Sequence, residues 1–301
     1  FWYRQCFEGS HHIESLQLLD AGSHEEFQKL FINSEYRQSL LSPLFICGVQ
    51  KINVFSCALE KLFVHLRRFY LEKIISGCVL NQVEQNFILA LSMQCHLTEY
   101  IFDETPQESR YVNDLELDNY QNIIIYSCYR SLMQRKDSDE IISKLNEHSS
   151  SSQDFLELHF LQPAKYKSLK DGISTLSEIN DVVSKAVRNQ YEENPYPRWL
   201  SESSLPHLPV QSVDENYIKG VRVLIAGCGT GRHIFHARAR YPFSDITAVD
   251  LSLSSLAYAE MKIEEYKLEN IRIFQADILN LNILKEEFDI IESMGVLHHM
   301  Q

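Results

Sequence analysis

Three glycines at alternate positions, 227, 229 and 231, constrain this 301-residue chain more than any other feature, because they follow an apolar, β-branched run at 221–226. Continuous apolar sequence is typical of a strand buried on both faces of a parallel sheet. Glycines after such a strand allow a tight turn and a close approach to a ligand, because a Cβ atom would collide with it. A second apolar run ends at Asp250, whose carboxylate can accept hydrogen bonds from ribose hydroxyls. The two features predict a site for a nucleoside-bearing cofactor.

The spacing of the glycines favours one cofactor over another. A dinucleotide fingerprint reads G-x-G-x-x-G, and its last glycine lets a helix pack closely and aim its N-terminus at a pyrophosphate. Here the order is G-x-G-x-G, and Arg232 stands where the last dinucleotide glycine would be. S-adenosylmethionine carries ribose and adenine but no pyrophosphate. The spacing therefore predicts S-adenosylmethionine rather than NAD(P).

Four segments in order resemble the motifs of class I S-adenosylmethionine-dependent methyltransferases. They are GCGTG at 227–231, AVDLS at 248–252, QADI at 275–278 and FDIIESMGVLHH at 288–299. One departure is Ile225, which stands where the family often has an acidic residue. The resemblance implies that the cofactor is bound by Gly227, Cys228, Gly229, Gly231, Asp250, Leu251, Asp277, Ile278 and Met294, with Asp250 on the ribose and Asp277 and Ile278 on the adenine.

The segment before the first strand, QYEENPYPRW at 190–199, is similar to a bacterial group of this family that often carries tetratricopeptide repeats. No 34-residue repeat is visible in this chain, so such an array would lie upstream. In the family a helix at this place often covers the cofactor. By that resemblance Tyr191, Tyr196, Arg198 and Trp199 are candidates to cover its methionine part; alternatively, the segment only docks the helical half onto the sheet.

The catalytic residues cannot be assigned from the sequence. Methyl transfer from a sulfonium is an in-line displacement that depends mainly on positioning, and a base matters only if the acceptor arrives protonated. Glu292, His298 and His299 follow the fourth strand, where the family places the methyl group, and are the candidates. The histidine pair could instead cap the next loop. No metal is expected, because no further ligands stand at metal spacing.

Alternating strands and helices after residue 220 predict an α/β fold, a Rossmann-like parallel sheet with the first four strands of a class I methyltransferase. An all-α domain precedes it. We expect an α-helical domain at 1–175, a helix with a Pro-rich connector and possible cofactor lid at 176–219, and the methyltransferase domain at 220–301. We expect the sequence to be truncated at both ends and the fragment alone to be inactive.

The composition of the chain narrows the classes of partner that we expect it to bind. The net charge of −13 makes nucleic acid and membrane surfaces poor partners, and no run of 18 apolar residues is present. Seven scattered cysteines without a C-x-x-C motif indicate a reducing, cytoplasmic location. The expected activity is methyl transfer to an unidentified small molecule or protein. Two alternatives stay open: an NAD(P)-dependent oxidoreductase, and a non-catalytic interaction module with a pseudo-methyltransferase sheet.

Overall fold

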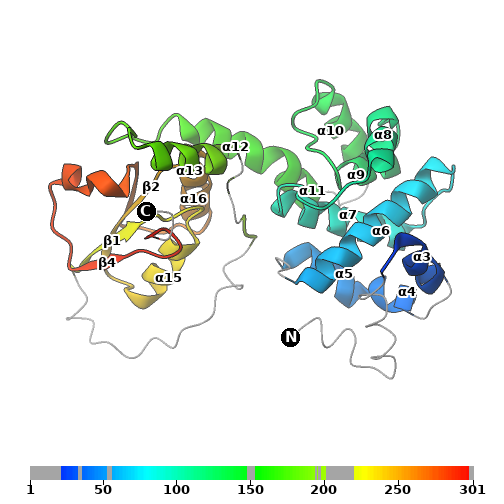
Figure 1. Ribbon diagram of the computed structural model, residues 1–301, viewed down its shortest axis with the longest axis horizontal. Coiled ribbons are helices and arrows are strands. Elements are labelled where there is room, and N and C mark those ends of the chain that lie inside the picture. The colour runs from blue at the N-terminus through cyan, green and yellow to red at the C-terminus, as the bar shows by residue number, and fades with distance from the viewer. Residues whose placement is uncertain are drawn as a thin grey trace. The chain divides into compact units, whose positions relative to one another are not determined.

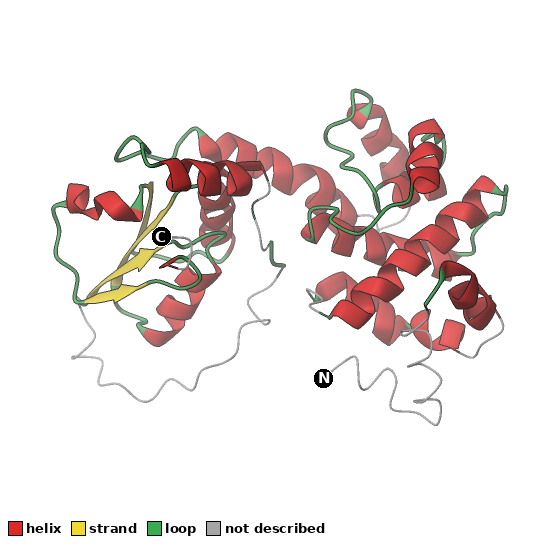
Figure 2. Cartoon of the chain, viewed as in Figure 1, coloured by secondary structure: helices red, strands yellow, loops and turns green. Residues whose placement is uncertain are grey.

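The computed structural model describes residues 22–32, 36–52, 56–147, 153–193, 195, 198–200 and 220–297. The chain divides into two compact units, 1–161 and 162–301. Figure 2 shows that one unit is helical and that the strands belong to the other. The sequence analysis placed 162–175 in the α-helical domain. The structure instead packs α12 (Gln162–Lys170) along α16 (Leu253–Glu265) of the second unit, so the division falls earlier.

The first unit is built on two long helices, α6 (Cys57–Ile75) and α7 (Gln82–Leu97), whose apolar faces form its core. A capping box fixes the start of α7, in which the Asn81 side chain accepts from the Glu84 amide and Glu84 accepts from the Asn81 amide. The other described elements of this unit are α3 (His24–Ile32), α4 (Tyr36–Leu40), α5 (Pro43–Lys51), α8 (Pro106–Asp114), α9 (Tyr120–Tyr126), α10 (Ser138–Asn146), α11 (Gln153–Leu156) and the π-helix η2 (Glu157–Leu161).

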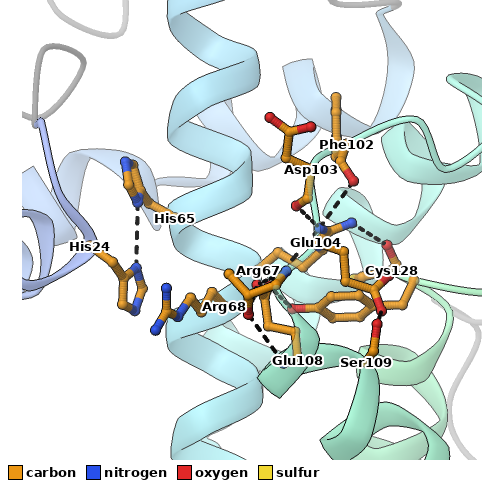
Figure 3. Close-up of polar contacts among 12 residues, drawn as sticks. His24, His65, Arg67, Arg68, Phe102, Asp103, Glu104, Glu108, Ser109 and Cys128 are labelled. Atoms are coloured by element: carbon orange, nitrogen blue, oxygen red, sulfur yellow. Dashed lines mark hydrogen bonds and ion pairs between the residues drawn. The ribbon is translucent and has the colours of Figure 1, made fainter.

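One buried arginine of α6 links this helix to three other parts of the core, at Asp103, Glu108 and Cys128 (Figure 3). Arg67 of α6 is 1% exposed and donates hydrogen bonds to the carbonyls of Asp103, at 2.6 Å, and Cys128, at 3.3 Å. Its guanidinium also lies over the Tyr129 ring and 4.0 Å from the Glu108 carboxylate. A buried cation needs such partners, because isolated charge is costly away from water. Arg67 therefore holds parts of the helical core together.

The second unit contains a four-stranded parallel sheet in the order β3-β2-β1-β4. Figure 1 labels β2, β1 and β4 of this sheet. Its strands are β1 (Arg222–Ala226), β2 (Asp245–Asp250), β3 (Ile271–Gln275) and β4 (Ile290–Glu292). In register, Ile225 of β1 lies beside Ala248 of β2 on one side and Glu292 of β4 on the other. Since all strands run in one direction, their carboxyl ends meet at one edge of the sheet. This confirms the predicted α/β, Rossmann-like fold.

Helices cover the two faces of the sheet unequally. Val223 and Ile225 point into a core made with α15 (Arg232–Arg240) and α16, whereas Leu224 points to the other face, which the 3-10 helix η4 (Ile278–Leu284) covers. The outer edge of β3 is partly paired as well, because Thr175 forms a parallel bridge with Gln275. Segment 174–176 therefore lies against the sheet just before α13 (Val182–Glu193) begins.

Candidate active site

The glycine loop after β1 places one backbone position against open space. Gly227, Gly229 and Gly231 all have positive φ angles, of 87°, 52° and 88°. A Cβ atom on Gly227 would lie 2.2 Å from Val296, so this glycine lets the loop after β4 cross the first turn. A Cβ atom on Gly229 would meet nothing within 4 Å. Gly229 is thus the position at which a ligand can approach the bare backbone.

Gly231 has a different task from the one the sequence analysis gave it. It is the N-cap of α15, and a Cβ atom there would lie 2.7 Å from the Cβ atom of Ala259 on α16. The glycine therefore allows α15 and α16 to pack closely, and it does not line the cavity described below. Close packing is the role that the last glycine plays in a dinucleotide loop. In this chain Gly231, the last glycine of the G-x-G-x-G motif, has that role.

Asp250 lies at the carboxyl end of β2 and braces the glycine loop. Its carboxylate accepts hydrogen bonds from the Gly229 amide at 2.8 Å and from the Ser252 amide at 3.0 Å. Burial raises the pKa of Asp250 above its ordinary 3.8, and these two amide hydrogen bonds act in the opposite direction. Each carboxylate oxygen keeps a second lone pair for a further donor.

Asp277, after β3, presents an unsatisfied acceptor. Its Oδ1 atom accepts from the Leu279 amide at 3.0 Å and so caps η4. Its Oδ2 atom is buried and has no hydrogen-bond partner among the described residues. A buried acceptor without a partner costs free energy, which a ligand with an N–H donor would recover. An adenine amino group is such a donor, so Asp277 fits an adenosyl cofactor.

Gly229, Asp250 and Asp277 all line one cavity of about 520 Å³, a size in the range of small-molecule sites. Of the residues that the sequence analysis assigned to the cofactor, all except Gly231 line it. The lining residues in this set are Gly227, Cys228, Gly229, Asp250, Leu251, Asp277, Ile278, Met294 and Tyr191. The sequence therefore identified nine of the residues that line the cavity.

Helix α13 contributes a wall of the cavity through Val183, Ser184, Val187 and Tyr191. Its N-cap is Asp181, whose Oδ2 atom accepts from the Ser184 amide at 2.8 Å. This helix is where the sequence analysis placed a possible lid.

The other end of α13 is tied to the start of α16. Glu192 accepts from the Ser252 hydroxyl at 3.1 Å and from the Ser254 amide at 3.2 Å, and it forms an ion pair with Lys170 of α12. Burial acts to raise the pKa of Glu192, but the hydrogen bonds from Lys170 and Ser254 lower it on balance. The ion pair and both hydrogen bonds hold α13 beside the loop that follows β2.

Two of the residues predicted to cover the methionine part lie in the core instead. Trp199 is fully buried, donates from Nε1 to the Thr230 carbonyl at 3.0 Å and packs edge-on against Phe235. Arg198 is also buried, with its guanidinium over the Tyr166 ring. At these two residues the connector thus packs against helices of the α/β unit, and neither residue lines the cavity. Tyr196 lies outside the described residues.

The carboxylate of Glu292, one of the predicted bases, is engaged by side chains of α15 and its C-terminal end. Its carboxylate accepts from His233 Nε2 at 2.8 Å and from Tyr241 at 3.3 Å, and it forms an ion pair with Arg240. These partners all belong to α15 or its end, and Glu292 does not line the cavity. The other two candidates, His298 and His299, lie outside the described residues.

The thiol at Cys228 is no nucleophile in this setting. Burial raises its pKa well above 9.0, and the Asp250 carboxylate adds to the effect, so the thiol stays protonated. Among the described residues, no three His, Cys, Asp or Glu side chains gather in a way that could hold a metal ion. In the same residues, no helix is long and apolar enough to cross a bilayer.

Sequence reasoning missed one wall of the cavity. Arg232, His233 and His236, all from the first half of α15, line it together with Met294 and Val296 of the loop after β4. Positions 232 and 236 are one turn apart and so share a face of the helix. That periodicity was readable, but it does not tell which face of the helix meets a cavity.

Comparison with known proteins agrees with this geometry. Residues 223–301 match the family model described as a methyltransferase domain. Protein syc1184_c of Synechococcus sp. is 28% identical over 143 residues, which are 42% of this chain and 34% of that protein. Protein RP028 of Rickettsia prowazekii is 28% identical over 120 residues, or 38% of this chain and 48% of that protein. The matched segments thus span between a third and a half of these relatives. The predicted tetratricopeptide repeats stay a prediction.

Among solved structures, coclaurine N-methyltransferase bound to N-methylheliamine and SAH aligns over 78% of this chain and 55% of its own. The identity is 18% and the TM-score is 0.23, which is too low for the likeness to support an argument. The sheet order and the family match are independent of it. By both, the segment 223–301 is similar to a class I methyltransferase domain, and the cofactor of that class is S-adenosylmethionine.

Proposed function

We propose that the protein transfers a methyl group from S-adenosylmethionine to a small molecule or a protein. The supporting observation is the order of three features along one cavity. Asp277 follows β3, Asp250 ends β2 and Gly229 follows β1, and the three strands are neighbours in the sheet. An adenine, a ribose and a methionine chain are joined in the same order in the cofactor.

Each feature then has one task. Asp277 accepts from the adenine amino group through its unsatisfied Oδ2 atom, beside Ile278. Asp250 accepts from the ribose hydroxyls with the lone pairs that Gly229 and Ser252 leave free. The bare backbone at Gly229 lies against the methionine part, and Tyr191 of α13 covers it.

When bound, the sulfonium of the cofactor supplies an activated methyl group. The residues of the chain supply position, because holding the nucleophile in line with that methyl group can contribute about 7–11 kcal/mol to catalysis. Helix α13, held by Glu192, closes one side of the cavity and restricts the entry of water. The loop 294–296 and the start of α15 border the end of the cavity where the acceptor must arrive.

Isothermal titration calorimetry on the full-length protein tests the cofactor. We expect S-adenosylhomocysteine to bind and NAD to leave the heat signal unchanged. Binding of NAD alone would overturn the proposal in favour of an oxidoreductase. If neither compound binds, the protein is an interaction module whose sheet has lost its ligand.

A second experiment addresses the acceptor. The full-length protein is incubated with methyl-labelled S-adenosylmethionine and a cell extract, and the extract is then separated into protein, nucleic acid and small molecules. We expect label in the protein or the small-molecule fraction. Label only in nucleic acid would contradict the acceptor class, and no label in any fraction, despite cofactor binding, would contradict the activity.

A further inference from the structure

His236 is one of the cavity-lining groups whose hydrogen bonding is incomplete. It lies one turn into α15, and its Nε2 atom is buried without a hydrogen-bond partner among the described residues. A buried ring nitrogen without a partner is unfavourable, and native structures rarely leave one so. A ligand in the cavity that offers a donor would satisfy it.

The neighbouring histidine differs from His236 in its hydrogen bonding. His233 Nε2 lies 2.8 Å from the Glu292 carboxylate, which also pairs with Arg240. The carboxylate therefore orients His233. Of the two histidines among the described residues that line the cavity, His236 is the one whose Nε2 atom has no acidic partner. The same network removes Glu292 as a base, since the carboxylate is already engaged on α15.

The charges around His236 keep its imidazole neutral. Burial lowers the pKa of His236 below 6.5, and Arg232, His233 and Arg240 of its own helix lower it further, against the opposing charge of Glu292 on β4. A neutral imidazole at pH 7 can accept a proton, whereas an imidazolium cannot.

The strand order indicates which part of the ligand His236 meets. Asp277 and Asp250 occupy the side of β3 and β2, so an adenosyl group there directs the rest of the cofactor toward β1 and β4. Helix α15 follows β1, and residues 294–296 follow β4. His236 and Met294 thus line the half of the cavity where the methyl group and the acceptor must meet.

Resting on the function proposed above, we infer that His236 is the catalytic base and that the acceptor carries an O–H or N–H nucleophile. As the oxygen or nitrogen forms its bond to the methyl carbon, the carbon–sulfur bond breaks and its electron pair stays on sulfur, which becomes a neutral thioether. The proton of the acceptor moves to Nε2 of His236. The resulting imidazolium releases that proton to solvent after the product leaves.

The first test measures proximity rather than activity. The full-length protein, labelled at its histidines, is titrated by NMR with S-adenosylmethionine or with S-adenosylhomocysteine, and His236→Gln identifies the signal. We expect His236 to titrate at lower pH with the sulfonium compound, because a positive charge in the cavity disfavours the imidazolium. His65 of α6, in the other compact unit, is the control and should titrate alike in both complexes.

The second test follows transfer of labelled methyl groups from S-adenosylmethionine to the cell extract. His236→Gln should lower the rate by about 10²–10⁴-fold and remove the loss of rate at acid pH, with calorimetric binding of S-adenosylhomocysteine unchanged. His65→Gln should change neither. Identical titration of His236 in the two complexes, or an acid limb that persists in His236→Gln, would overturn the inference. Failure of both compounds to bind would instead overturn the proposed function.

Discussion

Two glycines of one loop should respond in opposite ways to the same substitution. Gly231→Ala is expected to destabilise the α/β unit while leaving the cofactor contacts at Gly229, Asp250 and Asp277 unchanged, because Gly231 packs on α16. Gly229→Ala is expected to leave stability nearly unchanged and to weaken cofactor binding, because its added methyl group enters open space at the cavity. The two substitutions therefore separate the effect of helix packing on stability from the effect of the glycine loop on cofactor binding.

The magnitudes follow from the local geometry. At Gly231 the φ angle of +88° is costly for alanine, by about 1–3 kcal/mol. The new Cβ atom would also lie 2.7 Å from the Cβ atom and 3.0 Å from the Cα atom of Ala259, and overpacking of this kind costs about 1–3 kcal/mol. At Gly229 the φ angle of +52° lies in the left-handed region, which costs about 1–2 kcal/mol without any clash.

A smaller term partly offsets both costs, because alanine reduces the entropy of the unfolded chain by about 0.4–1 kcal/mol. The net expectation is a loss of about 2–5 kcal/mol in the free energy of unfolding for Gly231→Ala and of about 1 kcal/mol or less for Gly229→Ala. The affinity for S-adenosylhomocysteine should fall more than about tenfold in Gly229→Ala, which corresponds to about 1.4 kcal/mol.

Urea unfolding followed by tryptophan fluorescence measures the first quantity. The chain has two tryptophans, and Trp199 is fully buried in the core that α15 and α16 share. A Trp2→Phe background therefore makes the signal specific to the α/β unit. Calorimetry measures the second quantity on the same proteins. Equal destabilisation by both substitutions, together with normal binding by Gly229→Ala, would refute the assignment of the two glycines.

Three further predictions concern side chains. Asp250→Asn should weaken binding of S-adenosylhomocysteine about tenfold or more, since hydrogen bonds to a charged acceptor contribute about 1.5–3 kcal/mol each. Because burial raises the pKa of Asp250 and ribose hydroxyls favour its carboxylate, affinity in the unsubstituted protein should fall as the pH drops toward that pKa, and calorimetry should find this dependence reduced in the variant. Glu192→Gln should loosen α13 and raise the calorimetric Kd severalfold without lowering the urea midpoint of the unit, whereas an unchanged Kd would show that the tether has no part in binding. Arg67→Ala should lower the free energy of unfolding of the helical unit by about 3–5 kcal/mol, because Glu108 would stay buried without its cation (Figure 3); circular dichroism in urea measures it, and the exposed Arg110→Ala should have almost no effect.

The parts of the site that lie at strand ends could be predicted from the sequence. An apolar run fixes where a strand ends, and parallel strands bring their carboxyl ends to one edge. For this reason Gly229, Asp250 and Asp277 were placed correctly around one cavity. The order of strands did not have to be known for this, because each residue comes directly after its strand.

The parts that depend on the direction of a side chain could not be predicted in this way. Trp199 in a proline-rich connector has the same chemistry whether it covers a ligand or fills a core, and only the fold brings the Thr230 carbonyl to its Nε1 atom. Glu292 lies at a strand end like Asp250, but its side chain is turned to α15, where His233 and Arg240 meet it. Which face of α15 borders the cavity depends on how the helix packs against α16.

The close packing at Gly231 and the exposure of His236 to the cavity are linked through one helix. Because Gly231 has no Cβ atom, α15 can approach Ala259 of α16 and start directly after the loop. That position brings the first turn and a half of α15, with Arg232 and His236 on one face, to the side of β1 that faces the loop after β4. A larger residue at position 231 would move α15 away from α16 and so shift His236 relative to the ligand. The third glycine therefore contributes to the chemistry of the site without touching the cofactor, through the placement of the helix that carries the proposed base.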